Sequence, residues 1–375
     1  MTRLNRNQLE QMTWPIAKIY TEIQTEILEG IATALAEDQG ALEDDANAWH
    51  AMKLEQIGPL RKQAIKIIAR KSGLKTSKVT EILLNVGLAA IDSNESLLKR
   101  ALKAGAPLIE APKPRDDPAI WRVLESFERQ SSSIFNMINS SMLNNSEQVY
   151  RDILTKATAD VITGMKTPQE ALRRTMGSWA ERGIPTLIKR NGDRMYAEEY
   201  ASQVMRTMGN RVANDMQDSR FDSWGVDLVE ISSHEGARPN CAPYQGQIYS
   251  RSGNDPNYPA LSDTSIGEPD GLFGINCGHF QYPYIPGVST QRYHPVDEEK
   301  NEEVYEDSQK QRQFERFIRK GKRELAVFEK LNDEVGIKRA QTKISRRQAQ
   351  LREFIDETGR TRRRDREQIY FKGVS

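Results

Sequence analysis

The sequence predicts a mainly α-helical protein that carries one small α+β domain. Two observations lead to this class. Apolar residues recur at three- and four-residue steps through the first half of the chain and again after residue 308, which is the periodicity of amphipathic helices. Between residues 225 and 289 this pattern stops, and Gly, Pro, Asn, Ser and Tyr become frequent. At 375 residues the chain is long enough for two or three compact units.

The N-terminal region, residues 1–104, is predicted to hold three helices. The first has one apolar stripe, formed by Leu9, Met12, Ile16, Ile19, Ile23, Ile27, Ile31 and Leu35. A second helical pattern covers about residues 41–71, and a third about residues 76–104. Residues 105–118 contain four prolines and are predicted to be a linker, because such a segment cannot continue a helix.

Helical patterns resume in a second region, residues 119–224. They predict helices over about residues 119–144, 146–163, 168–182 and 198–218. The last of these is the clearest amphipathic segment in the middle of the chain, and we interpret it as a helix with one face toward a core. That face is formed by Ala201, Val204, Met205, Met208, Val212 and Met216.

The predicted small α+β domain covers residues 225–289. Its stretch 226–232, VDLVEIS, alternates apolar and polar residues as a half-buried strand does. The rest of the domain is rich in loop-forming residues and poor in aliphatic ones. Aromatic side chains are therefore expected to fill much of its core.

Charge is distributed unevenly toward the C-terminal end of the chain. Residues 297–307 carry seven acidic residues against one Lys, within a predicted acidic linker at 290–307. From Gln309 onward, 20 Lys and Arg stand against 10 Asp and Glu. Apolar stripes on either side of a turn candidate predict that residues 308–375 form a basic helical hairpin and tail, although Gly321 weakens its first helix.

Two interpretations of the basic hairpin stay open. Lys and Arg neutralise DNA phosphates without reading sequence, so the hairpin can face double-stranded DNA. Alternatively, charge pairs one helical turn apart simply keep an exposed helix soluble. The acidic run can likewise screen or mimic DNA, or act as a flexible tether. The candidate DNA-facing residues are Arg346, Arg347, Arg360, Arg362, Arg363, Arg364 and Arg366.

Composition and motifs exclude several classes. The net charge of +1 gives no overall attraction to nucleic acid or membranes, and two cysteines exclude a disulfide framework. The first residues lack the apolar segment of a signal peptide, and we expect a soluble chain made in the cytosol. Phosphate-binding loops, the G-x-S-x-G elbow and the H-E-x-x-H motif are missing from the sequence, so no enzyme class is supported.

Both cysteines and two of the four histidines fall in the small domain, as His234, Cys241, Cys277 and His279. Two Cys and two His are the right ligand types for a structural zinc, although their spacing differs from that of familiar zinc modules. A thiol nucleophile such as Cys241 with His279 as its base is a second hypothesis. A third is that both thiols are buried as small apolar residues beside hydrogen-bonded histidines. The sequence leaves these three open.

Several long stretches resemble a known family. They are GVDLVEISSHEGARPNCAPYQGQIYS, YPALSDTSIGEPDGLFGINCGHFQYPYIPGVS, the upstream NGDRMYAEEYASQVMRTMGNRV, and the downstream QRQFERFIRKGKRELAVFEK and REFIDETGRTRRRDRE. Together they span about residues 185–367. They resemble the minor capsid proteins of tailed phages and prophages of Gram-positive bacteria, which are similar in role to the head morphogenesis proteins of the phage Mu type.

The resemblance implies a structural virion protein present in few copies near the portal vertex inside the phage head, after assembly in the host cytoplasm. It implies a role in head assembly or genome delivery, with the portal protein, other capsid or scaffold proteins and double-stranded DNA as expected partners. It implies no catalytic step, and it does not decide whether the Cys/His residues hold a metal. No cofactor is expected apart from the structural zinc considered above. The competing hypothesis is a hydrolase carried in the virion, either zinc- or thiol-dependent, with the Cys/His cluster at its centre.

Overall fold

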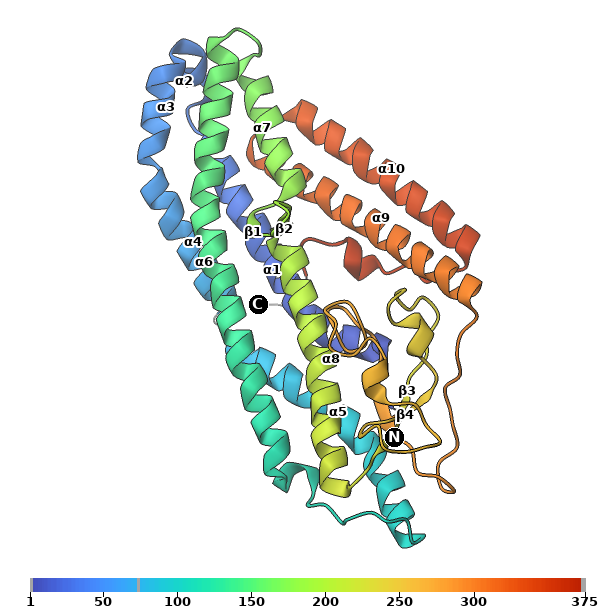
Figure 1. Ribbon diagram of the computed structural model, residues 1–375. Helices are drawn as coiled ribbons and strands as arrows, with labels where there is room; N and C mark the ends of the chain where they lie inside the picture. The colour runs from blue at the N-terminus through green and yellow to red at the C-terminus, as the bar shows by residue number, and fades with distance from the viewer. Residues whose placement is uncertain (1–2, 73–74, 372–375) are drawn as a thin grey trace. The chain divides into compact units, whose positions relative to one another are not determined.

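The structure is a computed structural model that describes residues 3–72 and 75–371. Residues 1–2, 73–74 and 372–375, which belong to the predicted N-terminal region and basic tail, lie outside the described residues. The described chain is mainly α-helical with two small antiparallel sheets, which confirms the predicted fold class (Figure 1). No helix in the described ranges combines the length and the apolar character needed to cross a membrane.

The chain divides into two compact units, and neither is continuous in sequence. The first unit consists of Met1–Ile16, Thr76–Ile134 and Ser202–Ser308. The second consists of Ala17–Lys75, Phe135–Ala201 and Gln309–Ser375. The residues predicted as the small α+β domain thus belong to the first unit together with helical segments, and the basic hairpin belongs to the second.

Five helices precede the proline-rich segment: α1 (Arg6–Ala36), α2 (Gln39–Asp44), α3 (Ala46–Glu55), α4 (Ile57–Ser72) and α5 (Lys75–Lys103). The single helix expected over 41–71 is therefore divided. Asp45 explains the division before α3, because its extended backbone ends α2 and its side chain accepts the N–H groups of Asn47 and Ala48. In the proline-rich segment, Pro114–Asp116 form the 3₁₀ turn η1.

The middle of the chain contains α6 (Pro118–Ile162), α7 (Pro168–Arg182) and α8 (Ala197–Trp224). Helix α6 runs without a break through the position where two helices were expected. The polar side chains at that position have partners: Asn145 donates to the Pro185 carbonyl at 2.7 Å, and Ser146 donates to the Leu143 carbonyl at 2.7 Å. Between α7 and α8 lies a hairpin that was not predicted, β1 (Pro185–Ile188) paired with β2 (Arg194–Tyr196).

The second sheet lies in the first unit and has the strand order β4-β3-β5, with both pairings antiparallel. Its strands are β3 (Leu228–Ile231), β4 (Ile248–Ser250) and β5 (Gln281–Pro283), with the 3₁₀ turns η2 (Ala242–Tyr244) and η3 (Leu261–Asp263) in the connections. The central strand β3 is buried along its whole length, not on one face as the alternation suggested. The surrounding core is formed by Leu98, Ala101, Phe221, Trp224, Val226, Val229, Ile231, Cys241, Tyr249, Leu261, Leu272, Cys277 and Ile285.

Helices α9 (Glu298–Lys330) and α10 (Glu334–Thr358) form the predicted charged hairpin and lie side by side (Figure 1). Most of the acidic run expected as a linker is helical, because α9 begins at Glu298. Acidic residues in a first turn are stabilised by the helix dipole, which favours this start. A Cβ atom at Gly321 would lie 3.0 Å from Cγ1 of Ile344 on α10. The glycine that was expected to weaken α9 therefore allows the two helices to pack closely at this point. The 3₁₀ turn η4 (Arg364–Glu367) follows the hairpin.

Candidate functional site

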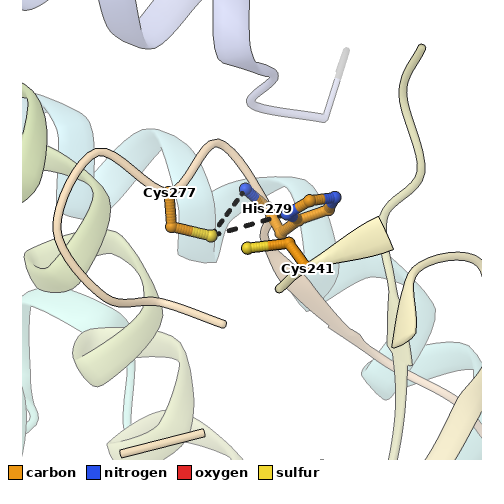
Figure 2. A group of neighbouring side chains, drawn as sticks. All are labelled: Cys241, Cys277 and His279. Carbon is orange, nitrogen blue, oxygen red and sulfur yellow. Dashed lines mark hydrogen bonds between the residues drawn. The ribbon is translucent and has the colours of Figure 1, made fainter. Parts of the chain in front are cut away.

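The structure brings together three of the four residues predicted as metal ligands. The ligand atoms of Cys241, Cys277 and His279 all lie within 4.8 Å of one another, and all three residues are buried. Figure 2 shows the two sulfur atoms pointing toward each other with the His279 side chain beside them. The fourth residue, His234, lies against this group: its ring stacks on that of His279 with centroids 4.5 Å apart. We refer to the four residues as the Cys/His cluster.

Two loops position the thiols, one between β3 and β4 and the other leading into β5. Cys241 directly precedes η2, and its N–H donates to the Arg238 carbonyl at 2.8 Å. Cys277 lies before β5, where its N–H donates to the Gly274 carbonyl at 3.1 Å. The preceding residue, Asn276, has a left-handed backbone conformation with φ of 59°. This turn brings Cys277 to the sulfur of Cys241, although the two residues are far apart in the sequence.

Helix α8 fixes the backbone of His279 through two hydrogen bonds. The carbonyl oxygen of His279 accepts hydrogen bonds from the side-chain amides of Asn210 at 2.9 Å and Asn214 at 3.1 Å. Both asparagines are buried, and Asn214 also accepts the N–H of Gln281 at 3.0 Å. Polar residues of α8 therefore anchor the segment that leads from His279 into β5.

Gln245 determines which nitrogen of His279 carries the proton. Its Oε1 atom accepts the backbone N–H of His234 at 2.9 Å, so this atom must be the amide oxygen. The same oxygen lies 3.2 Å from Nε2 of His279, which must then donate. Nδ1 of neutral His279 is left with its lone pair, 3.5 Å from the sulfur of Cys277. The imidazole thus presents an acceptor to the two thiols.

His234 is the second imidazole of the cluster. Its shortest polar contact joins Nδ1 to the Glu235 carbonyl at 3.1 Å, which requires a proton on Nδ1, while Arg6 Nη1 lies farther away at 3.4 Å. Nε2 therefore carries the lone pair, and it is buried with no hydrogen-bond partner among the described residues. Burial, with contributions from His279 and Arg6, lowers the pKa of His234 to about 3. The ring is neutral at physiological pH.

The thiols differ in their surroundings. A hydrogen bond to Cys277, together with burial, raises the pKa of Cys241. Burial also acts to raise the pKa of Cys277, but hydrogen bonds from the Cys241 thiol and from the backbone N–H of His279, which donates to the Cys277 sulfur at 3.4 Å, act against it, and the pKa lies well below its usual range. Both sulfurs are shielded from solvent, with exposed fractions of 0% for Cys241 and 3% for Cys277. A substrate thus has no open approach to either thiol in this conformation.

The seven arginines predicted to face DNA lie in the second unit and divide into two groups. Arg346 on α10 and Arg364 in η4 are exposed. The other five are half-buried, and several contact neighbouring side chains. Arg347 lies over the Phe317 ring at 4.7 Å, and Nε of Arg360 donates to Oε1 of Gln311 at 2.8 Å. Arg362 binds Glu367 through bonds of 2.6 and 2.7 Å, and Nη1 of Arg366 lies 3.7 Å from Oε2 of Glu315. Arg363 is the fifth half-buried residue.

Comparison with known proteins decides the family. Residues 4–356 match the family described as Phage minor capsid protein 2, which is nearly the whole chain. The chain belongs to the phage minor capsid protein 2 family. This confirms the resemblance found over about residues 185–367 and extends it into the helical N-terminal half of the chain.

Two phage proteins are similar to this minor capsid protein. A structural protein of Lactococcus phage LL-H is 31% identical over 336 residues, which cover 86% of this chain and 89% of the relative. A structural protein of Lactococcus phage mv4 is 35% identical over 116 residues, which cover 31% of this chain and 94% of that relative. No solved structure matches. The chain is thus a structural protein of the phage virion by family.

Proposed function

We propose that this minor capsid protein lies near the portal inside the phage head, where it contacts the portal protein and other capsid or scaffold proteins during head assembly or genome delivery. The observation that carries the proposal is the family match over residues 4–356. Two further features support a role in contacts with large partners. Long helices such as α6, with 45 residues, offer extended surfaces, and the basic hairpin supplies cations for packaged DNA.

Exposed apolar side chains support contacts with other virion proteins. Ile162 at the end of α6 and Met165 in the following turn are 56% and 70% exposed, and they lie within one short connection. Large apolar residues that are close together and open to water are common where a partner covers them. We therefore place one of the proposed protein contacts at this connection.

We further propose that the chain is not an enzyme. A thiol nucleophile needs a thiolate that substrate can reach, and both thiols of the Cys/His cluster are buried. His279, the base considered with Cys241, is also buried and has its Nε2 hydrogen bonded to Gln245. These surroundings favour a structural role for the cluster over a hydrolytic one.

The test is the composition of phage particles and the neighbours of this chain in them. Particles are purified from infected cells, treated with a short lysine-reactive cross-linker, and analysed by quantitative mass spectrometry. We expect a few copies per head and cross-links to the portal protein in full heads. Absence of the chain from purified particles would overturn the virion role. Presence with cross-links to tail proteins alone would overturn the position near the portal.

A matched pair of variants tests the proposed contact at the α6–α7 connection. In particles complemented in trans, Ile162→Ser with Met165→Ser is expected to lower the number of copies incorporated per head. The control, Ile65→Ser, removes an exposed apolar side chain on α4 and is expected to leave incorporation unchanged. Equal incorporation of all three chains would remove this connection from the proposed contact surface.

A further inference from the structure

We propose that Cys241, Cys277, His279 and His234 bind one zinc ion that holds the loops of the sheet domain together. This inference does not depend on the proposed position in the phage head. It rests on the chemical types of the four side chains, on the direction in which their lone pairs point, and on the distances between them.

The donor types suit zinc. Two thiolates and two neutral imidazoles are a common ligand set for structural Zn²⁺, whereas Mg²⁺ and Ca²⁺ prefer oxygen ligands. With metal–sulfur bonds of about 2.3 Å and metal–nitrogen bonds of about 2.0 Å, the ligand atoms of a tetrahedral site lie about 3.3–3.8 Å apart. Nδ1 of His279 is already 3.5 Å from the sulfur of Cys277, and the three-atom group lies within 4.8 Å. Small movements of Cys241, Cys277 and His279 therefore suffice to bring their three ligand atoms to these separations.

The hydrogen bonds around His279 are those that a metal ligand needs. A metal-binding imidazole usually donates its second N–H to an oxygen acceptor, which fixes the tautomer and the ring orientation. Gln245 is such an acceptor, because its Oε1 receives the Nε2 proton of His279 and directs Nδ1 toward the two sulfurs. Gln245 is itself buried, with an exposed fraction of 1%, and holds the backbone of His234 at the same time. It is the positioning residue of the proposed site.

His234 supplies the fourth ligand. Its Nε2 is a buried lone pair without a partner among the described residues, which is unfavourable unless something binds there. Gly278, between the other two ligands of the loop, permits this approach, because a Cβ atom there would lie 3.1 Å from that nitrogen. The two imidazole rings are nearly parallel, at 16°, and a metal lies in the plane of a ring that binds it. His234 therefore has to turn out of the stack when zinc binds, whereas the other three ligands need only small movements.

The position of the site in the fold gives it a structural purpose. Cys241 comes from the loop after β3, and Cys277 and His279 come from the loop that leads into β5. Both loops contain little regular secondary structure, and a metal that binds side chains from both of them stabilises their folded arrangement. Zinc binding would join two loops that are otherwise connected mainly by hydrogen bonds.

The experiment measures metal in the full chain, purified under reducing conditions without chelator. Elemental analysis is expected to give about one zinc per chain, and thiol titration in denaturant is expected to find both cysteines reduced. After removal of zinc, added Co²⁺ should produce the visible absorption of a tetrahedral thiolate complex. Unmodified protein that contains no zinc and takes up no Co²⁺ would overturn the proposal, as would a disulfide between the two cysteines.

Variants then test the ligands one by one. Cys277→Ser and His279→Ala are expected to lose the metal, whereas His234→Ala should keep a site with at least about tenfold weaker affinity. His294→Ala, an exposed histidine of the same unit, is the control and should keep full zinc content. Zinc retained at full affinity in both Cys277→Ser and His279→Ala would place the metal elsewhere. If a variant fails to fold, the zinc content and the Co²⁺ spectrum of the unmodified chain still decide the proposal.

Discussion

The carboxylate of Glu198 and the guanidinium of Arg323 form a buried ion pair, with Nη1 of the arginine 3.0 Å from Oε2 of the glutamate. Arg323 also donates through Nε to the Ala180 carbonyl at 2.8 Å, and Arg319 pairs with the other oxygen of Glu198. A charge on α9 thus joins the end of α7 to the first turn of α8 within the second unit. Because all three charged side chains are at least nine-tenths buried, the pairing depends on the ionised form of Glu198.

We predict that Glu198→Gln destabilises the protein by about 3 kcal/mol at pH 7, because it leaves two buried guanidinium groups without a counter-charge. Burial acts to raise the pKa of Glu198, but Arg319 and Arg323 outweigh it and hold that pKa below its ordinary value of 4.5. Stability from this pair is therefore fully present above about pH 4.5 and is lost as the pH falls through the lower pKa of the folded state. Guanidinium unfolding followed by circular dichroism measures it.

The pH dependence separates this electrostatic role from a packing role. The difference between wild type and Glu198→Gln should shrink as the pH falls below about 4.5, because Glu198 then takes up a proton in the unfolded state while the folded state keeps it ionised down to a lower pH. Glu199→Gln, the next residue along α8, is the control and should change stability by less than about 0.5 kcal/mol. A difference that stays constant from pH 7 to pH 3 would contradict the assignment.

The second prediction concerns Arg220, which joins α5 and α6 to α8 in the first unit. Its guanidinium binds both oxygens of Glu95, at 2.6 and 2.9 Å, and donates to Asp117 at 3.0 Å. Lysine keeps the charge but cannot form the planar two-bond contact. We expect Arg220→Lys to cost about 2 kcal/mol in chemical denaturation. Arg211→Lys on the same helix, where Nε of the arginine donates to the Phe273 carbonyl at 3.4 Å, should cost much less.

The third prediction tests the close contact between Gly321 and Ile344. On helix propensity alone, Gly321→Ala should stabilise α9 by about 1 kcal/mol. The new methyl group would lie 3.0 Å from Cγ1 of Ile344, so we expect the gain to be cancelled or reversed. In an Ile344→Ala background the same substitution should stabilise the protein. A double-mutant cycle measured by thermal unfolding gives the coupling, and a coupling near zero would show that the two helices do not meet there.

The sequence predicted most helices because their apolar stripes are long and regular. It did not predict the division at Asp45, where one capping side chain outweighs the periodicity, or the hairpin β1–β2, whose strands are too short to show alternation. It divided α6 at Asn145, whose side chain finds a partner on Pro185 that only the folded chain supplies. Local signals were therefore sufficient for long helices and insufficient where a distant contact decides.

The candidate site shows the same limit. Composition alone singled out all four residues of the Cys/His cluster, because Cys and His are rare in this chain. Nothing in the sequence marked Gln245 as the residue that fixes the tautomer of His279, since a glutamine in a loop is ordinarily exposed. The same holds for Glu198 and Arg323, which resemble surface charges until the fold buries them together. Their partners are distant in sequence, and burial is a property of the folded chain.

The last prediction tests contact between the basic hairpin and DNA. Arg346 and Arg364 are the exposed members of the predicted set, so Arg346→Glu with Arg364→Glu should weaken binding to a fluorescent 30-base-pair duplex of arbitrary sequence. If each arginine neutralises one phosphate, the slope of log affinity against log salt should fall by about 2 between 50 and 200 mM salt. The control reverses two exposed arginines of the first unit, Arg122→Glu with Arg129→Glu, and changes the net charge equally. If the control weakens binding as much as the hairpin variant does, the loss of affinity comes from net charge and not from these two positions. If the hairpin variant keeps its affinity, DNA is not the partner of these arginines.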